Sequence, residues 1–335
     1  MNPRQKRVLR WSVRGVVVFG LPLWLYSCMI LMPGKSHQGP LPAMTPKQAE
    51  LSAQLRRDVI ELAEKIGERN TFHYAELRKA ADYMERELAV AGKVSRHTYT
   101  ARGKTCDNIE VEIPGRTTPG EIVVVGGHYD SVVGCVGAND NGTGAAGVLA
   151  LARSLAKTSP ARTLRFVGFV NEEPPHSRTD EMGSRVYAKR CRERRENIVA
   201  MLSLETIGFF SDADGSQHYP APLGLFYPSE GNFIAFVGNV GSRALVRRCI
   251  RVFREQAAFP SEGAAVPGFL PGVGWSDHES FWEHGYSALM VTDTAPFRYP
   301  HYHLTGDTPD KIDFDRCARV VDGIESVLRD LAGIP

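Results

Sequence analysis

Apolar positions divide the chain from residue 46 onward into helix-like and strand-like stretches. Residues spaced three or four apart predict an amphipathic helix at the start of this part: Leu51, Leu55, Val59, Leu62 and Ile66. A second helix is predicted over residues 72–91, because the pattern stops at Gly92. Two short strands are then expected over residues 97–101 and 108–113, with Pro114-Gly115 as a turn.

The middle and the end of the chain alternate short apolar runs with helical patterns. Buried strands are predicted over residues 121–127, 164–170, 198–204, 233–237 and 288–292. Helices are predicted over residues 144–155, 182–191, 242–256 and 314–331. This alternation predicts an α/β fold with three layers, in which helices cover both faces of a mostly parallel, mixed central sheet. Ligand sites in such sheets lie at the carboxyl ends of the strands.

The N-terminal part has a different pattern. A charge-free run over residues 16–32 follows a basic segment that contains no acid and five cations: Arg4, Lys6, Arg7, Arg10 and Arg14. We therefore expect residues 1–34 to be a cytoplasmic tail and transmembrane signal anchor, residues 35–45 a Pro/Gly-rich linker, and residues 46–335 a domain outside the cytoplasm, periplasmic or extracellular. A cleaved secretory signal and a lipoprotein signal at Cys28 remain alternatives.

Composition narrows the function classes. The 335 residues are 43% hydrophobic and 23% charged, which is typical of a globular protein, and the net charge of +2 argues against a nucleic-acid-binding protein. Six cysteines show no zinc-finger spacing, and we consider a Cys106–Cys135 disulfide because both residues are expected in loops near one strand. The oligomeric state cannot be read from the sequence.

Candidate chemistry follows three successive buried strands. His128 and Asp130 end the first, Glu172 and Glu173 the second, and Glu205 the third. Taken alone, each has a structural interpretation, such as a solvated strand end, and Asp140 in the turn GANDNGTG is an ordinary helix N-cap candidate. As a set of nitrogen and oxygen ligands at one edge of a sheet, they are typical of a zinc site.

These motifs resemble those of the zinc exopeptidases of metallopeptidase family 28. The resemblance runs from about residue 66 to 314 and includes GGHYDS, GANDNGTG, NEEPP with the later Met-Gly-Ser step, SDHESF and HLTGDTPD. The family includes bacterial leucyl aminopeptidases and, more distantly, glutamate carboxypeptidase and glutaminyl cyclase. One departure concerns Glu205, because the well-known aminopeptidases usually have Asp there, and its longer side chain puts the occupancy of the second metal site in question.

The resemblance implies a role for each position. Two zinc ions are expected, held by His128, Asp140, Glu173, Glu205 and His303, with Asp140 as the bridge and its bond to Asn141 as a cis peptide. Glu172 matches the general base, and Asp130 matches the partner that orients His128. His301 is ranked as a neighbour of the site, and Asp277 and His278 match a nearby motif without an assigned role.

The function implied is that of a zinc-dependent exopeptidase, in the first place an aminopeptidase that removes amino-terminal residues from peptides. Two alternatives stay open. One is a glutaminyl-cyclase-like acyltransferase with a single zinc, and the other is a non-catalytic binding domain of the same fold. A carboxypeptidase would need an Arg that binds the substrate carboxylate, and the sequence does not place one.

Overall fold

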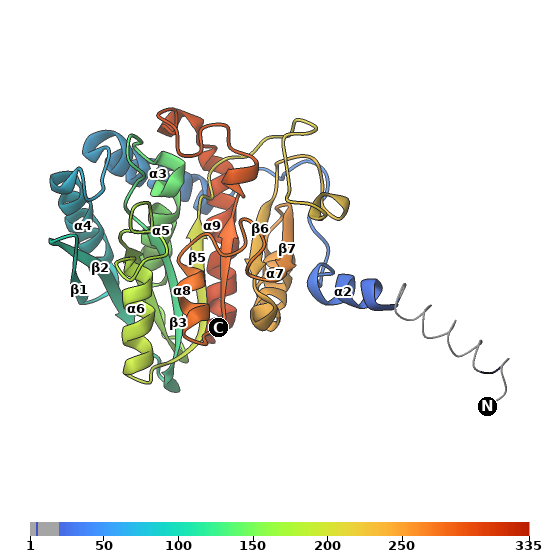
Figure 1. Ribbon diagram of the computed structural model, residues 1–335, viewed down its shortest axis with the longest axis horizontal. Helices are drawn as coiled ribbons and strands as arrows, with labels where there is room; N and C mark the ends of the chain where they lie inside the picture. Colours follow the sequence, from blue (N-terminus) through green and yellow to red (C-terminus); the bar gives the residue numbers. More distant parts are fainter. Residues whose placement is uncertain (1–4, 6–19, 335) are drawn as a thin grey trace.

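A single eight-stranded sheet forms the centre of the molecule (Figure 1). The computed structural model describes Gln5 and residues 20–334. The strand order is β1-β2-β4-β3-β5-β8-β6-β7. The strands are β1 (Val94–Ala101), β2 (Lys104–Ile113), β3 (Thr118–His128), β4 (Arg162–Phe169), β5 (Asn197–Glu205), β6 (Ile234–Gly238), β7 (Ser261–Ala265) and β8 (Ala288–Thr292).

The sheet is mixed, with a parallel centre. Strands β4, β3, β5 and β8 run parallel, whereas β2 and β6 pair antiparallel to β4 and β8. Side chains alternate between the two faces of β3, so Val123 and Val125 join one apolar cluster and Ile122 and Val124 join another. Both faces are therefore buried, which explains why these strands read as continuous apolar runs.

Helices cover both faces, which confirms the predicted three-layer α/β fold. Helices α3, α4, α5, α7 and α9 contribute to the larger cluster and α6 and α8 to the smaller one on the opposite face. The helices are α2 (Leu21–Met29), α3 (Pro46–Ile60), α4 (Tyr74–Leu88), α5 (Gly144–Leu155), α6 (Gly183–Glu193), α7 (Arg243–Gln256), α8 (His278–Glu283) and α9 (Phe314–Ala332). Short 3-10 or π turns are η2 (Glu61–Ile66), η3 (Ala89–Ala91), η4 (Ala138–Thr143), η5 (Leu223–Leu225), η6 (Val240–Ser242), η7 (Ala295–Phe297) and η8 (Pro309–Lys311).

Local sequence explains the start of α3, which begins at the predicted residue. Thr45 and Gln48 form a capping box, in which the Gln48 backbone N–H donates to the Thr45 hydroxyl and the Thr45 N–H donates to the Gln48 side chain. Two elements, β7 and α8, were not predicted from the sequence. Strand β7 has no β-branched residue, and α8 has only 6 residues, too few to show a helical period.

The N-terminal segment lies along the domain. Of the predicted charge-free run, residues 16–19 are outside the described residues, and α2 occupies part of the remainder. Among the described residues, the helices are all too short or too polar to cross a bilayer. Residues 35–45, expected as a linker, contact the domain: Leu41 and Met44 pack against the larger cluster, and Arg319 donates to the carbonyl of Pro42 at 2.6 Å.

The expected Cys106–Cys135 disulfide is wrong, because all six cysteines are free. Cys106 lies on β2 opposite Tyr99, within the larger apolar cluster. The Cys135 thiol instead donates to the carbonyl of Leu304 at 3.1 Å. The two thiols thus have different neighbours.

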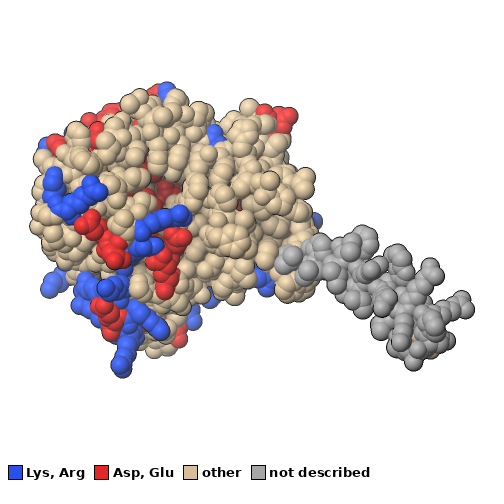
Figure 2. All heavy atoms as spheres, in the orientation of Figure 1, with Lys and Arg blue, Asp and Glu red and all other residues tan. Residues whose placement is uncertain are grey.

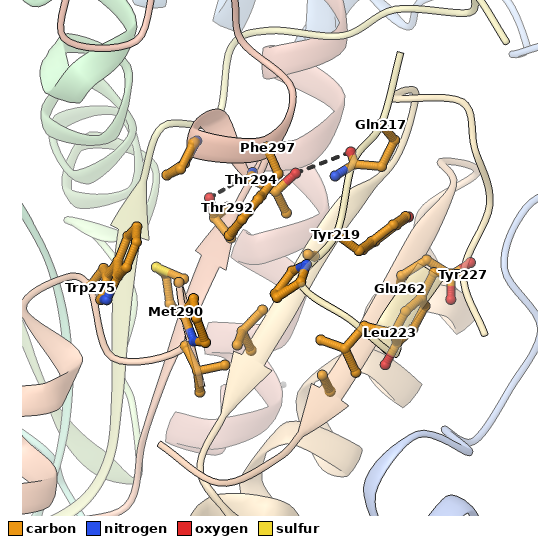
Figure 3. A pocket seen from close by; sticks show the side chains of 18 of the residues that line it. Gln217, Tyr219, Leu223, Tyr227, Glu262, Trp275, Met290, Thr292, Thr294 and Phe297 are labelled. Carbon is orange, nitrogen blue, oxygen red and sulfur yellow. Dashed lines mark hydrogen bonds between the residues drawn. The ribbon is translucent and has the colours of Figure 1, made fainter. Parts of the chain in front are cut away.

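The surface is uneven in charge and shape. Charged side chains gather on the left of the view in Figure 2, whereas the part nearest to the N-terminal segment is largely uncharged. Beside the ends of β5 and β8, an apolar pocket opens between the sheet and the loops around Tyr219 and Phe297 (Figure 3).

Candidate metal centre

The ends of three parallel strands bring the predicted acidic and histidine residues to one edge of the sheet. In β3, His128 is the last residue and pairs with Phe169 at the end of β4. Glu172 and Glu173 follow β4, and Glu205 is the last residue of β5. Because β3 lies between β4 and β5, these side chains converge although they are far apart in the sequence.

The side chains form three overlapping groups of three potential ligands. One consists of His128, Glu172 and Glu173, and the other two are adjacent clusters that share Asp140. In the first of these two clusters, His128 Nε2 lies 3.4 Å from Asp140 Oδ1 and 3.4 Å from Glu205 Oε2. In the second, His303 Nε2 lies 3.1 Å from Asp140 Oδ2 and 3.3 Å from Glu173 Oε2. Within each cluster the potential ligand atoms lie within 4.8 Å of one another. The two oxygens of Asp140 thus face different clusters, as a bridging carboxylate requires.

Buried atoms without partners show that the site fits metal ions. His128 Nε2, Asp140 Oδ2 and Glu173 Oε1 are buried and make no hydrogen bond. Such groups are rare because an unsatisfied buried polar atom costs about 1–3 kcal/mol. Burial and the nearby Asp140 raise the pKa of Glu173 to about 7. Cations at both clusters would remove the repulsion between these carboxylates, and the nitrogen and oxygen donors suit zinc.

Nearby carboxylates raise the pKa of both histidines of the clusters. Burial lowers the pKa of His303, but the adjacent carboxylates of Asp140 and Glu173 outweigh this effect and raise the pKa to about 10. For His128, burial is likewise outweighed, chiefly by Glu205 and Asp130, so its pKa lies well above the usual value. A bound metal ion would take the place of these protons, since a histidine ligand must be neutral.

Asp130 holds three members of the site in place. His128 Nδ1 lies 3.2 Å from the backbone carbonyl oxygen of Asp130 and 3.4 Å from its Oδ1, so the ring is oriented with Nε2 toward the clusters. The backbone N–H groups of Glu172 and Glu173 donate to the two carboxylate oxygens of Asp130, each at 3.2 Å. One residue thus fixes a histidine and the backbone of both glutamates, as expected for a residue that supports a metal ligand.

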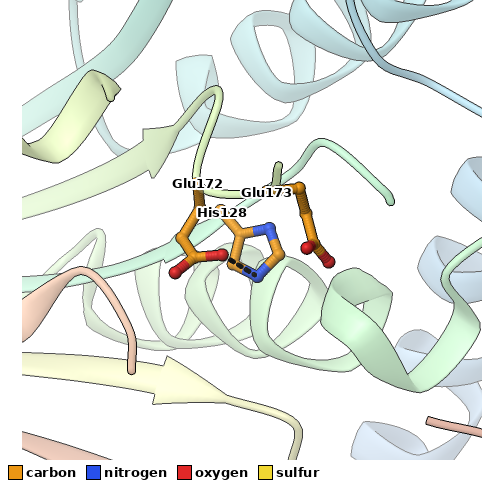
Figure 4. Close-up of side chains that lie close together, drawn as sticks. All are labelled: His128, Glu172 and Glu173. Carbon is orange, nitrogen blue, oxygen red and sulfur yellow. Dashed lines mark ion pairs between the residues drawn. The ribbon is translucent and has the colours of Figure 1, made fainter. Parts of the chain in front are cut away.

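The adjacent glutamates have different surroundings. In Figure 4 their carboxylates lie on opposite sides of the His128 ring. Glu172 Oε2 is 3.8 Å from His128 Nε2, and Glu172 also lines a polar pocket that includes Ser177 and Arg178. Burial raises the pKa of Glu172 well above its usual value. A carboxylate that reaches the clusters from the pocket side and has a raised proton affinity is suited to accept and return a proton.

The turn that carries Asp140 is held by Asp307. The N–H groups of Asn139 and Asp140 donate to the Asp307 carboxylate at 2.8 and 3.0 Å, and Tyr299 donates its hydroxyl proton to it at 2.9 Å. The Asp140–Asn141 peptide bond is cis, as the resemblance implies. Asp307 belongs to the HLTGDTPD motif, but sequence reasoning did not give it a role.

Arg69 is a second residue that sequence reasoning missed. Its side chain is completely buried and donates to the carbonyls of Tyr129, Val136 and Gly137, the loop between His128 and Asp140. Burial lowers its pKa to about 10. No local pattern signals this role, because the loop lies about 60 residues further along the chain.

The SDHESF motif supports Glu205. Ser276 donates its hydroxyl proton to Glu205 Oε2 at 2.7 Å. Burial raises the pKa of the neighbouring Asp277 to about 7, and neither of its oxygens has a hydrogen-bond partner. His278 instead contacts the carbonyl of Val273 at 2.7 Å, and burial lowers its pKa to about 4. It belongs to neither cluster. His301 also lies outside them and packs on Tyr299.

Two hollows adjoin the centre and share Trp275 and Tyr302. The polar one is lined by Glu172, Glu173 and His303. The other, shown in Figure 3, includes Glu205 among its lining residues and has a cavity volume of about 90 Å³. Its walls are mainly apolar, and among the described residues they include no Lys, Arg or His: Tyr219, Leu223, Phe233, Val237, Val266 and Met290 are typical members.

Comparison with known proteins agrees with this geometry. The model of peptidase family M28 matches residues 108–328, which contain every residue of the two clusters. The chain belongs to this family. It is 34% identical over 294 residues to an uncharacterized protein of Escherichia coli strain K12, YfbL, covering 85% of this chain and 89% of that protein.

More distant relatives bear the names of zinc enzymes. A probable zinc metalloprotease of Pyrenophora teres is 29% identical over 265 residues, covering 69% of this chain, which spans about half (52%) of that protein. A zinc aminopeptidase from Bacillus subtilis has the same fold, with a TM-score of 0.68, 15% identity and coverage of 84% and 95% of the two chains. Glutaminyl cyclase from Fimbriiglobus ruber also shares the fold, with a TM-score of 0.60 and 20% identity, covering 89% of this chain and 99% of that one. Family membership thus supports a peptide hydrolase that uses zinc.

Proposed function

We propose that this member of family M28 is an aminopeptidase that uses two zinc ions. The observation on which the proposal rests is the pair of three-residue clusters that share Asp140, beside a glutamate that belongs to the polar pocket. Glu205 reaches the first cluster despite its longer side chain, because Ser276 holds it. In this proposal His128 and Glu205 bind one ion, Glu173 and His303 bind the other, and Asp140 binds both.

Glu172 acts as the general base. Zinc, when bound, lowers the pKa of a coordinated water toward about 7 and polarises the scissile carbonyl. Glu172 accepts the proton of the attacking water and later donates it to the leaving amine. Asp130 keeps the Glu172 backbone in place through the 3.2 Å hydrogen bond to its N–H.

The apolar pocket accepts the side chain of the amino-terminal residue. Glu205, a member of the first cluster, is one of its lining residues, so a side chain in the pocket leaves the substrate backbone near the two clusters. Its apolar walls favour a large apolar side chain, and the absence of a cation among its described lining residues argues against binding a carboxylate there. The acidic centre suits a positively charged α-amino group. The rest of the peptide then extends along the polar pocket past Arg178.

The test compares Glu172→Gln with the unaltered protein. Both should contain two zinc equivalents and unfold at similar temperatures, but kcat for leucyl and phenylalanyl peptides should fall by about 10²- to 10⁴-fold. Near-normal turnover would contradict the role of Glu172. A peptide with amino-terminal glutamine distinguishes the proposed peptidase from the alternative, a glutaminyl cyclase of the same fold. A peptidase releases free glutamine, whereas a cyclase releases ammonia and leaves a pyroglutamyl peptide.

The location of the protein is part of the proposal. The five cations before residue 16 and the charge-free run that follows favour a membrane anchor with the domain outside the cytoplasm, periplasmic or extracellular. Peptides on that side of the membrane are then the substrates. Resistance to alkaline extraction from membranes, together with protease access in intact cells, tests the anchor independently of activity.

A further inference from the structure

The segment that follows α2 is attached to the domain by a row of arginines. These lie on one face of α7, about four and eleven residues apart, and donate to backbone carbonyls of the N-terminal segment: Arg243 to Cys28, Arg247 to Leu31 and Arg254 to Pro33. The Met32 side chain is buried. The charge-free run therefore enters the domain without an intervening spacer, in contrast to the linker expected over residues 35–45.

The same segment supports the wall of the apolar pocket. Met29 and Ile30 pack against a cluster of Ala264, Val266 and Val273, all of which also line the pocket. The Tyr26 ring lies 5.5 Å from that of Phe226, next to the pocket residue Tyr227. The predicted anchor and the proposed specificity pocket are thus in direct contact.

Large apolar side chains are exposed around this contact. We call them the apolar rim: Trp24, Tyr26, Leu31, Leu225, Phe226 and Phe269. Leu225 is 81% exposed and Phe269 is 86% exposed, and the neighbour of Phe269, Leu270, packs against the same cluster of Ala264, Val266 and Val273 as Met29 and Ile30 do. Figure 2 shows few charged side chains on the visible surface beside the N-terminal segment. Single exposed apolar residues are common, but a group of them beside an apolar segment marks an interaction surface.

The length of the charge-free run indicates what covers the apolar rim. A helix of the 17 residues 16–32 would be only about 26 Å long, and the hydrocarbon core of a bilayer is about 30 Å thick. Contacts with the domain already begin at Tyr26 and Cys28, so at most residues 16–25 of the run are free. As a helix this part is about 15 Å long, and it can enter the hydrocarbon deeply only if the domain lies against the membrane, with the rim at the interface.

We propose that the apolar rim contacts the lipid bilayer, so that the loops that form the mouth of the apolar pocket lie at the membrane surface. Leu223 and Tyr227 flank the rim residues Leu225 and Phe226, and Pro271 follows Phe269 closely, and these three flanking residues line the pocket. Peptides adsorbed on the membrane through an apolar amino terminus are then presented to the pocket. The inference rests on the proposed anchor and the pocket, but not on hydrolysis.

The test places one fluorophore on the rim of the full chain. In a Cys28→Ser background, where the remaining cysteines are buried, Phe269→Cys is labelled with an environment-sensitive dye and reconstituted into phosphatidylcholine–phosphatidylglycerol vesicles. Phe72→Cys is the matched control, since Phe72 is also an exposed aromatic residue (61%) but lies just before α4, at the opposite end of the domain from α2 (Figure 1). Leu225→Cys is a second rim position in case the first variant misfolds.

Bromine on the lipid acyl chains should quench the rim label several-fold more than the control, and aqueous iodide should quench it less. Equal iodide quenching at both positions would overturn the proposal. Protection from iodide without bromine quenching would also overturn it, because another protein chain would then cover the rim. If alkaline treatment released the chain from the vesicles, the anchor itself would be wrong. The same measurements in Glu172→Gln make the result independent of the proposed catalytic role.

Discussion

The metal centre and the apolar pocket adjoin each other, yet the chain builds them in different ways. The centre consists of side chains at strand ends and in the loops that follow them, and four of the five ligand candidates lie in a short motif such as GGHYDS or NEEPP. The pocket consists of side chains spread along the sequence from Glu205 to Tyr302, on the four strands β5, β6, β7 and β8 and on several loops. The centre depends on a few atoms at defined distances, whereas the pocket depends on a shape.

This difference has a physical cause. A metal site needs particular donor atoms, so only His, Asp, Glu or Cys can occupy its positions. An apolar wall can be made by many residues of similar volume, so no single position has a required identity. We therefore expect substitutions in the centre to act on metal content and turnover, and substitutions in the pocket to act on the choice of substrate.

The strongest test of the comparison is Asp140→Asn, which keeps the shape but removes the shared charge. We expect loss of at least one zinc equivalent and a decrease in kcat/KM of about 10³-fold or more, because metal ions contribute several kcal/mol to transition-state stabilisation. Asp82→Asn is the control, since its side chain is 65% exposed. Full zinc content with near-normal kcat/KM for a leucyl peptide would show that Asp140 is not a bridge.

A smaller effect is expected for Ser276→Ala. The change removes the 2.7 Å hydrogen bond to Glu205 but no ligand, so the affinity for one zinc ion should fall about 10- to 100-fold. Competition with a chelator measures this affinity. Ser280→Ala is matched, because Ser280 is buried and bonds to Ser184 away from the clusters. Equal zinc affinity in the two variants would contradict a supporting role for Ser276.

The smallest effect on total activity is expected for Met290→Ala in the pocket. The larger pocket should shift the kcat/KM ratio of phenylalanyl over leucyl peptides about tenfold, while zinc content is unchanged. Met201→Ala removes the same volume from the cluster on the α6 side and is the control. Both variants should lose about 2–5 kcal/mol of unfolding free energy, so only the ratio distinguishes them. A shift as large in Met201→Ala would place specificity outside the pocket.

The elements that the sequence predicted correctly, and those that it did not, follow the same division between residues of required type and residues that only fill space. The buried strands at the centre of the sheet were predicted because β-branched runs need burial on both faces, and the ligand candidates followed from their ends. Strand β7 and helix α8 were missed because they are short and lack a periodic pattern. The Cys106–Cys135 pair was wrong because a guess based on expected loop positions took no account of where the thiols point.

The sequence by itself determined the α/β fold class, the ligand candidates and the N-terminal apolar run, since each depends on residue type and spacing along the chain. Only the tertiary structure decided that Asp140 faces two clusters, that Arg69, Asp307 and Ser276 hold the centre, and that the N-terminal segment backs the pocket. The reason is that most of these contacts join residues about 60 to 240 positions apart, and no local pattern encodes a pairing at that distance.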